Sequence, residues 1–155
     1  KYSKEYNLDP YLIAAIINVE SNFNKNAISS KDARGLMQII PKTGEWAASK
    51  LGIENFTVEL LFEPETNIRI GTWYLDMLKK EFGDNIQLIL AAYNGGSGNV
   101  NKWLQNEEYC KDGKELKKIP FKETEQYIGK VLKNYEVYGN VYKNEFNEEA
   151  EDNEH

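Results

Sequence analysis

The segment that decides the fold class is residues 9–21, which read DPYLIAAIINVES. Asp9 followed by Pro10 is typical of a helix start, because aspartate caps the first amide groups and proline lacks the N–H that would be unpaired there. The positions after them are apolar on nearly every face: Leu12, Ile13, Ala14, Ala15, Ile16, Ile17 and Val19. Since a helix without a polar face is usually buried, this segment predicts a core helix.

Helical signals also dominate the rest of the chain. Proline starts, glycine ends and apolar runs predict further helices near residues 41–51, 64–82, 85–93, 100–104 and from 120 onward. In the last of these helices one apolar face is formed by Tyr127, Ile128, Val131, Tyr135 and Tyr138. Residues 22–34 and 105–119 are polar and predict loops, the second long enough to be mobile. Neither an internal repeat nor strand-like alternation is found. With 155 residues, the chain predicts one all-α domain of about six or seven helices.

Two scarce residue types exclude several kinds of enzyme. The only histidine is His155, the last residue, and the only cysteine is Cys110. Ser-His-Asp and Cys-His nucleophilic sites need a held imidazole, and a histidine–cysteine zinc site needs more ligands than the chain supplies. One cysteine forms no intramolecular disulfide, so we assign Cys110 no role. Acid–base chemistry must therefore fall mainly to carboxylates, tyrosines or lysines.

The acidic charge is concentrated at one end. The whole chain has 25 acidic and 19 basic residues, and residues 144–155 hold six of the acids with no Lys or Arg, so residues 1–143 carry 19 of each and are neutral. We expect 1–143 to be the folded domain and 144–155 a disordered acidic tail. Dispersed charges do not indicate nucleic-acid binding, and no run is long enough for a membrane span. Without an initiator methionine or leader, we expect an excised or mature segment.

Glu20 is the anomaly in the first apolar helix. On a helix it shares a face with Ile13, Ile16 and Ile17, which lie seven, four and three residues before it. A carboxyl among such side chains loses hydration in its charged form, so its pKa rises toward the range of a general acid at neutral pH. The alternative is that Glu20 simply ends the helix and points to water. Titration of the carboxyl separates the two.

Four short motifs occur in order along the chain. They are Glu20-Ser21, the run Gly35-Leu36-Met37-Gln38, the run Ala91-Ala92-Tyr93-Asn94-Gly95-Gly96, and Glu123-Thr124 before Tyr127-Ile128. With these motifs, residues 8–140 resemble the catalytic domain of the soluble lytic transglycosylases, of the lysozyme-like superfamily. The stretch Pro64-Glu65-Thr66-Asn67-Ile68 is similar to that family's intervening helix, although Glu65 and Asn67 more simply cap a helix.

The resemblance implies a lysozyme-like helical fold that cleaves the β-1,4 bond between N-acetylmuramic acid and N-acetylglucosamine in peptidoglycan. By position, Glu20 matches the single catalytic acid of the family. The positions that match the saccharide groove, or residues that steady the glutamate, are Ser21, Ser29, Met37, Gln38, Tyr93, Asn94 and Tyr127. Hydroxyls and amides suit sugar hydroxyls and N-acetyl groups, while Met and Tyr offer apolar surface to the sugar rings.

In the reaction that the resemblance implies, Glu20 protonates the departing oxygen and then, as carboxylate, deprotonates the C6 hydroxyl that closes a 1,6-anhydro ring. No second carboxylate, metal or cofactor is needed. One alternative is a hydrolytic muramidase in which Asp32 positions water as a second carboxylate. Another is a non-catalytic peptidoglycan-binding module. The resemblance further implies extracytoplasmic action on glycan strands, as part of a larger envelope protein or machine. The three tryptophans, Trp46, Trp73 and Trp103, fit a core or sugar platforms equally well.

Overall fold

The computed structural model describes the backbone of residues 1–154 and the side chains of residues 1–141. Over these residues the fold is entirely helical, with isolated bridges in place of strands. The elements are α1 (Tyr2–Glu5), α2 (Pro10–Ser21), α3 (Pro41–Leu51), the 3-10 helix η1 (Val58–Phe62), α4 (Pro64–Phe82), α5 (Ile86–Gly95), α6 (Ser97–Leu104) and α7 (Lys122–Glu154). The predicted all-α fold class is therefore confirmed.

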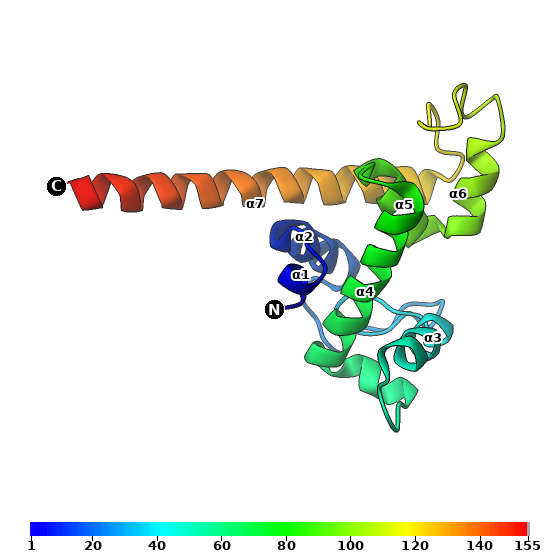
Figure 1. Cartoon of the computed structure of the whole chain (residues 1–155), viewed down its shortest axis with the longest axis horizontal. Helices are drawn as coiled ribbons and strands as arrows, with labels where there is room; N and C mark the ends of the chain where they lie inside the picture. Colours follow the sequence, from blue (N-terminus) through cyan, green and yellow to red (C-terminus); the bar gives the residue numbers. More distant parts are fainter. Residues whose placement is uncertain (155) are drawn as a thin grey trace.

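The apolar helix α2 is buried as its sequence predicts, with Ile16 fully inaccessible to solvent. The long helix α7 packs along both α2 and α5 (Figure 1). Of the face predicted for it, Tyr127, Ile128 and Val131 are buried, and Tyr135 and Tyr138 are half-buried. α4 contacts α1, α3, η1 and α5, and its buried residues belong to the single hydrophobic core. The candidate site lies where α2, α4, α5 and α7 approach one another.

Helix ends follow the local chemistry of the sequence. The Asp9 carboxylate accepts a 2.9 Å hydrogen bond from the Tyr11 amide and caps α2, as predicted. α3 ends at Gly52, whose φ of 69° is left-handed. At the start of α5 the cap is Asn85, whose side chain accepts from the Leu88 amide at 3.2 Å. The short helices α1 and η1 carry too few residues to show periodicity and were not predicted.

Asn67 does not cap α4 but fixes the loop before Met37. Its buried side chain donates to the carbonyls of Arg34 and Leu61, at 2.9 and 2.8 Å, and accepts from the Met37 amide at 2.8 Å. Gly35 lies beside it with φ 78°, and a Cβ there would come within 2.3 Å of the Asn67 amide nitrogen. Glu65, the other expected cap, instead accepts a hydrogen bond from the Tyr2 hydroxyl. The sequence interpretation of both residues as caps is therefore wrong.

The C-terminal third of the chain differs from expectation in two details. The loop between α6 and α7 is not wholly polar in its packing, because Cys110, Leu116 and Ile119 are buried. The backbone of α7 continues as helix past residue 143 to Glu154 and projects beyond the other helices (Figure 1), so the structure draws no boundary at 143. That 144–155 form a separate disordered tail stays a prediction, and His155 lies outside the described residues. No helix in the described part is long and apolar enough to cross a bilayer.

Candidate active site

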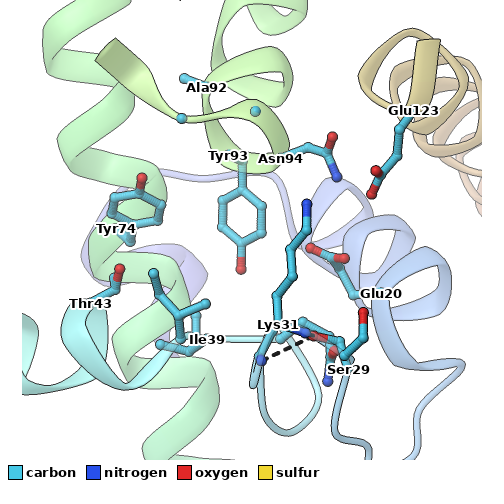
Figure 2. Close-up of a pocket in the computed structure, with 16 residues that line it drawn as sticks. Glu20, Ser29, Lys31, Ile39, Thr43, Tyr74, Ala92, Tyr93, Asn94 and Glu123 are labelled. Carbon is cyan, nitrogen blue, oxygen red and sulfur yellow. Dashed lines mark hydrogen bonds between the residues drawn. The ribbon is translucent and has the colours of Figure 1, made fainter. Parts of the chain in front are cut away.

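A pocket of about 490 Å³ opens beside the C-terminal turn of α2. Its walls come from the end of α2, the loop over residues 29–33, the turn before α3, the middle of α4 and the facing ends of α5 and α7 (Figure 2). Of the residues predicted from the sequence, five line it: Glu20, Ser29, Gln38, Tyr93 and Asn94. Segments far apart in the sequence therefore meet in a single pocket that includes the carboxyl group of Glu20.

The Glu20 carboxyl faces this pocket from the last turn of α2 (Figure 2). Burial removes water from the carboxylate and raises the pKa of Glu20 from 4.5 to about 8. The nearby hydroxyl of Tyr127 opposes this shift, and the negative charge of Glu123 adds to it. At neutral pH the group is therefore mostly protonated, which is the state a general acid requires. The alternative in which Glu20 only points to bulk water does not match this environment.

Tyr127 lies behind Glu20 and does not line the pocket. Its side chain is buried, and its Oη makes no hydrogen bond of ordinary length within the described residues. The hydroxyl is nevertheless close enough to Glu20 to stabilise the carboxylate, and burial together with the negative charge of Glu20 raises the pKa of Tyr127 well above its usual value. Tyr127 therefore acts on the acid from the core side.

Ser21 and Met37 also lie outside the pocket wall. The Ser21 hydroxyl donates to the Leu36 carbonyl at 2.7 Å and so ties the end of α2 to the turn before α3. Met37 is fully buried, and its sulfur packs so closely on Gly71 that a Cβ there would lie 2.3 Å from it. The expectation that Met37 offers side-chain surface to sugar is wrong, because α4 leaves room for the side chain only in the core.

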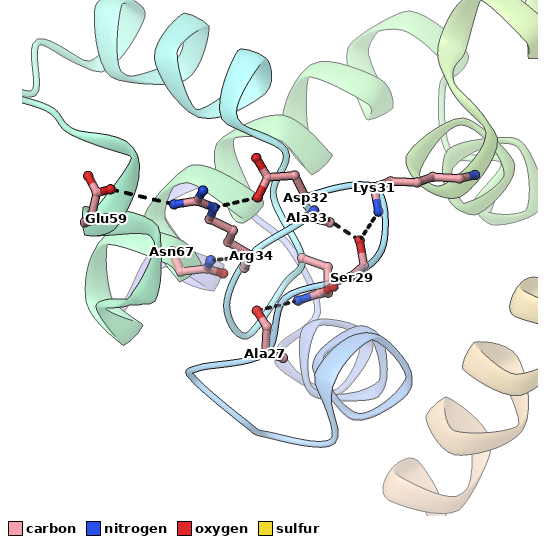
Figure 3. Close-up of polar contacts among 9 residues, drawn as sticks. Ala27, Ser29, Lys31, Asp32, Ala33, Arg34, Glu59 and Asn67 are labelled. Atoms are coloured by element: carbon pink, nitrogen blue, oxygen red, sulfur yellow. Dashed lines mark hydrogen bonds and ion pairs between the residues drawn. The ribbon is translucent and has the colours of Figure 1, made fainter.

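Ser29 (Figure 3) and Gln38 hold the loop that forms one rim of the pocket. The Ser29 Oγ accepts from the amides of Lys31 and Ala33, at 3.2 and 3.1 Å. Because a hydroxyl has two acceptor positions and one donor, the Ser29 O–H remains available to donate. Gln38 has a left-handed φ of 52°, and its amide nitrogen donates to the carbonyls of Ala27 and Gly35. Both side chains thus shape the loop as well as line the pocket.

Tyr93 and Asn94 bring the end of α5 to the opposite wall. The Tyr93 hydroxyl donates a 2.6 Å hydrogen bond to the Met37 carbonyl, and its ring lies 5.6 Å from that of Tyr74. The Asn94 amide oxygen accepts from Thr124 at 2.8 Å, which joins α5 to α7. The Asn94 nitrogen stays directed toward the pocket (Figure 2). This wall therefore combines a fixed aromatic face with an amide donor.

Asp32, the second carboxylate of the hydrolytic alternative, is directed away from the pocket. It is exposed on the loop, and its Oδ1 accepts a 2.9 Å charged hydrogen bond from Arg34, which also approaches Glu59 (Figure 3). Asp32 is not among the lining residues, so the geometry gives this alternative no support. Among the described residues, no group of three or more His, Cys, Asp and Glu side chains is arranged to hold a metal ion.

Several further lining residues carry no role in the sequence interpretation, among them Lys31, Thr43, Tyr74 and Glu123. Glu123 belongs to the quoted Glu123-Thr124 motif, so its position was indicated although its effect on Glu20 was not. Tyr74 lies in the middle of α4, and its position along that helix is the only signal that the sequence offers for it. Lys31 and Thr43 belong to no motif, and only the folded chain brings them to the pocket.

Comparison with known proteins identifies related chains. A model of the Transglycosylase SLT domain matches residues 1–116. The soluble lytic murein transglycosylase of Salmonella typhimurium is 37% identical over 140 residues, covering 89% of this chain and 22% of that protein. The corresponding Escherichia coli protein is 40% identical over 126 residues, covering 80% of this chain and 19% of its own length. The chain thus spans about a fifth of these curated relatives.

Solved structures show the same relationship. An inactive Glu-to-Gln variant of the lytic transglycosylase Slt from Pseudomonas aeruginosa superimposes with a TM-score of 0.80 at 36% identity, over 92% of this chain and 23% of that one. The soluble lytic transglycosylase of Escherichia coli gives a TM-score of 0.79 at 34% identity, with the same shares covered. From the matched model, the relatives and the shared fold, we conclude that this chain belongs to the Transglycosylase SLT domain family.

Proposed function

We propose that this domain is a peptidoglycan lytic transglycosylase that cleaves the β-1,4 bond between N-acetylmuramic acid and N-acetylglucosamine and leaves a 1,6-anhydro-N-acetylmuramic acid end. The observation that carries the proposal is the position of Glu20: a partly buried carboxyl that lines a pocket with hydroxyl, amide and aromatic walls. Family membership supports the same reaction, because the curated relatives are lytic murein transglycosylases.

In the first step Glu20 acts as an acid. Its proton passes to the glycosidic oxygen, the bond between that oxygen and C1 of the muramoyl residue breaks, and the N-acetylglucosamine side leaves with a hydroxyl group. A pKa near 8 keeps the carboxyl protonated for this step at neutral pH. The N-acetyl group of the substrate stabilises the positive charge that develops at C1.

In the second step the same group acts as a base. The Glu20 carboxylate removes the proton of the muramoyl C6 hydroxyl, and that oxygen forms a bond to C1. The anhydro ring closes and Glu20 regains its proton, so no water enters the products. One titratable group serves both steps, and the outward position of Asp32 is no obstacle.

The polar walls support binding of the glycan strand. Ser29 and Asn94 present donors, and Tyr93 presents a ring that its bond to Met37 holds in place. We propose that Gln38, Ser29, Tyr93 and Asn94 contact substrate, while Ser21, Met37 and Tyr127 position the elements around Glu20. A wall of this kind suits a substrate rich in hydroxyl and N-acetyl groups.

Mass analysis of digested peptidoglycan tests the reaction. Anhydro products lack one water relative to hydrolytic products, and we expect the anhydro form to dominate. Glu20→Gln removes the proton that is transferred, and we expect its rate to fall about 100- to 10,000-fold while glycan binding persists. Products that carry only reducing ends would overturn the proposal, as would a Glu20→Gln variant that cleaves at the original rate.

We further propose that the domain acts outside the cytoplasm, on the cell wall, as part of a larger protein. Its curated relatives are named soluble or membrane-bound murein transglycosylases, and they are several times longer than the matched segment. Fractionation of cells that carry the full-length protein, followed by detection of this domain, tests the location. Recovery only with the cytoplasmic fraction would contradict it.

A further inference from the structure

Lys31 brings a positive charge to the pocket of Glu20. Among the described residues that line this pocket, it is the only Lys or Arg, and the acidic side chains there are Glu20 and Glu123. Figure 2 shows the Lys31 side chain rising from the rim loop past Glu20 toward Asn94. The proposed reaction uses one carboxyl and gives this cation no part, so its presence in the pocket calls for another role.

The turn that carries Lys31 is fixed by its own hydrogen bonds. The Asp32 amide donates to the Ser29 carbonyl at 3.0 Å and closes a turn over residues 29–32. The Lys31 amide donates to the Ser29 Oγ at 3.2 Å. Asp32, with a left-handed φ of 64°, completes the reversal of the chain. The backbone of Lys31 is therefore held at the rim, and its remaining freedom lies in the side chain.

The Lys31 ammonium group has no partner in the protein. Asp32, its neighbour in sequence, is bound to Arg34 at 2.9 Å, and Figure 3 shows Lys31 and Asp32 leaving the loop in opposite directions. Within the described residues the Lys31 ammonium forms neither an ion pair nor a hydrogen bond. An ammonium group has three donors, so one that is directed into a pocket without a partner is suited to bind an anion from a ligand.

The proposed substrate carries its negative charge on one of its two sugars. N-acetylglucosamine is neutral, whereas N-acetylmuramic acid has a lactyl group on O3 that ends in a carboxyl. That carboxyl is either free or joined to a peptide, which then brings carboxylates of its own. Because C1 and the C6 hydroxyl of the muramoyl residue meet Glu20 in the proposed reaction, the lactyl arm of the same ring is carried into the pocket that Lys31 lines.

We propose that Lys31 is a specificity-determining residue that binds a carboxylate on the lactyl arm of the muramoyl residue, either the free lactyl carboxylate or one from the attached peptide. The proposal rests on the proposed function, because the muramoyl residue at Glu20 brings the carboxylate to Lys31. Both sugars of the strand have a C6 hydroxyl and an N-acetyl group, so the reacting groups alone do not tell them apart. Lys31 thus favours the muramoyl residue at Glu20 and takes no part in breaking the bond.

Affinity for matched glycan strands tests this role in the Glu20→Gln protein, where no cleavage interferes. In one preparation the peptides are removed, so that every muramoyl residue has a free lactyl carboxylate. In its partner preparation these carboxylates are converted to neutral methylamides. Lys31 is exposed, and we expect the carboxylate form to bind about fivefold more tightly, which is the upper range for an exposed ion pair. Added salt should reduce this preference.

Lys31→Met removes the charge and keeps most of the length of the side chain. We expect it to abolish the preference for the carboxylate form, and Lys31→Arg to retain most of that preference. Lys25→Met is the matched control, because Lys25 is exposed on the same connection between α2 and α3 and does not line the pocket. The control should keep the full preference. Thermal unfolding checks that each variant is folded.

A second pair of strands identifies the source of the carboxylate. Both strands keep their peptides, and in one of them the peptide carboxylates are converted to methylamides. A preference that depends on Lys31 in this pair alone assigns the carboxylate to the peptide. A preference that depends on Lys31 in the peptide-free pair alone assigns it to the lactyl group. Either result supports the role of Lys31.

The outcomes separate the role of Lys31 from the reaction. Equal affinity for the carboxylate and amide forms in both pairs would overturn the role, and so would a preference that persists in Lys31→Met. If the protein with Glu20 intact still releases anhydro products in that case, the proposed reaction stands. A preference that depends on Lys31, without anhydro products from the protein with Glu20 intact, would support carboxylate binding and overturn the reaction.

Discussion

The buried hydroxyl of Tyr127 faces the Glu20 carboxyl from the core side and lowers its pKa, while desolvation keeps that pKa near 8. Glu123, which lines the pocket from α7, acts in the opposite direction to Tyr127. Two residues of the same helix, four positions apart, therefore shift the pKa of Glu20 in opposite directions. This arrangement makes the pH dependence of the proposed reaction a direct readout of the site.

Tyr127→Phe should move the alkaline limb of the pH–activity profile to higher pH. The substitution removes the hydroxyl that favours the carboxylate, so the pKa of Glu20 rises and the acid stays protonated further into the alkaline range. Initial rates of anhydro-product release across the pH range measure the shift. Tyr138→Phe, on the same helix and without a place in the pocket, serves as the control. An alkaline limb that does not move would contradict the effect of the Tyr127 hydroxyl on the pKa of Glu20.

Glu123→Gln should move the same limb to lower pH. Without the negative charge of Glu123 the Glu20 carboxylate is less disfavoured, and the pKa of Glu20 falls toward its ordinary value. Glu125→Gln is the matched control, because Glu125 is exposed on α7 two residues away and does not line the pocket. The same rate measurements at low salt compare the three proteins. A shift of equal size in both variants would show a general charge effect and not one at Glu20.

Glu20→Gln should stabilise the protein increasingly as the pH rises from 4.5 to about 8. In this window the folded state holds a proton on Glu20 that the unfolded state releases, so the stability of the parent protein falls with pH. At about 1.4 kcal/mol for each pKa unit, the difference reaches a few kcal/mol and is constant above the window. Urea unfolding of both proteins on either side of the window measures it. A pH-independent difference would contradict the raised pKa.

Asn67→Ala should destabilise the fold by roughly 2–4 kcal/mol, because it leaves the Met37 amide and the carbonyls of Arg34 and Leu61 without partners in a buried place. Asn24→Ala removes one exposed hydrogen bond, to the Asn26 amide, and should cost less than about 0.5 kcal/mol. Chemical unfolding compares the two. Equal losses of stability in the two variants would show that the hydrogen bonds of Asn67 do not stabilise the loop before Met37.

The sequence predicts the helices well because their ends depend on local chemistry. Pro10, Pro41 and Pro64 each begin a helix, and Gly52 and Gly83 end two of them. It also identifies Glu20, since an acid among isoleucines on a helix face is a local pattern. The direction of a side chain is a different matter. Met37 and Gln38 are neighbours in one motif, yet one is in the core and the other lines the pocket, because the contact with Gly71 and a left-handed φ decide between them.

Residues that meet only through tertiary packing gave no comparable signal. Trp46 and Trp73 are both compatible with a core or a platform in the sequence, and their exposures of 43% and 8% follow from where α3 lies on α4. Asp32 is near Glu20 in sequence, but its bond to Arg34 takes it away. Asn67 has three partners that lie up to 33 residues away, so its role leaves no local pattern, and its place near the start of a helix suggests a cap instead.

The hydroxyls of Ser21 and Tyr93 donate to the carbonyls of two successive residues, Leu36 and Met37. The helix that carries the acid and the helix that carries the aromatic wall are thus attached to two adjacent peptide groups. One short turn is therefore a common anchor for both helices, so a substitution that displaces it would change the spacing between the acid and the aromatic wall.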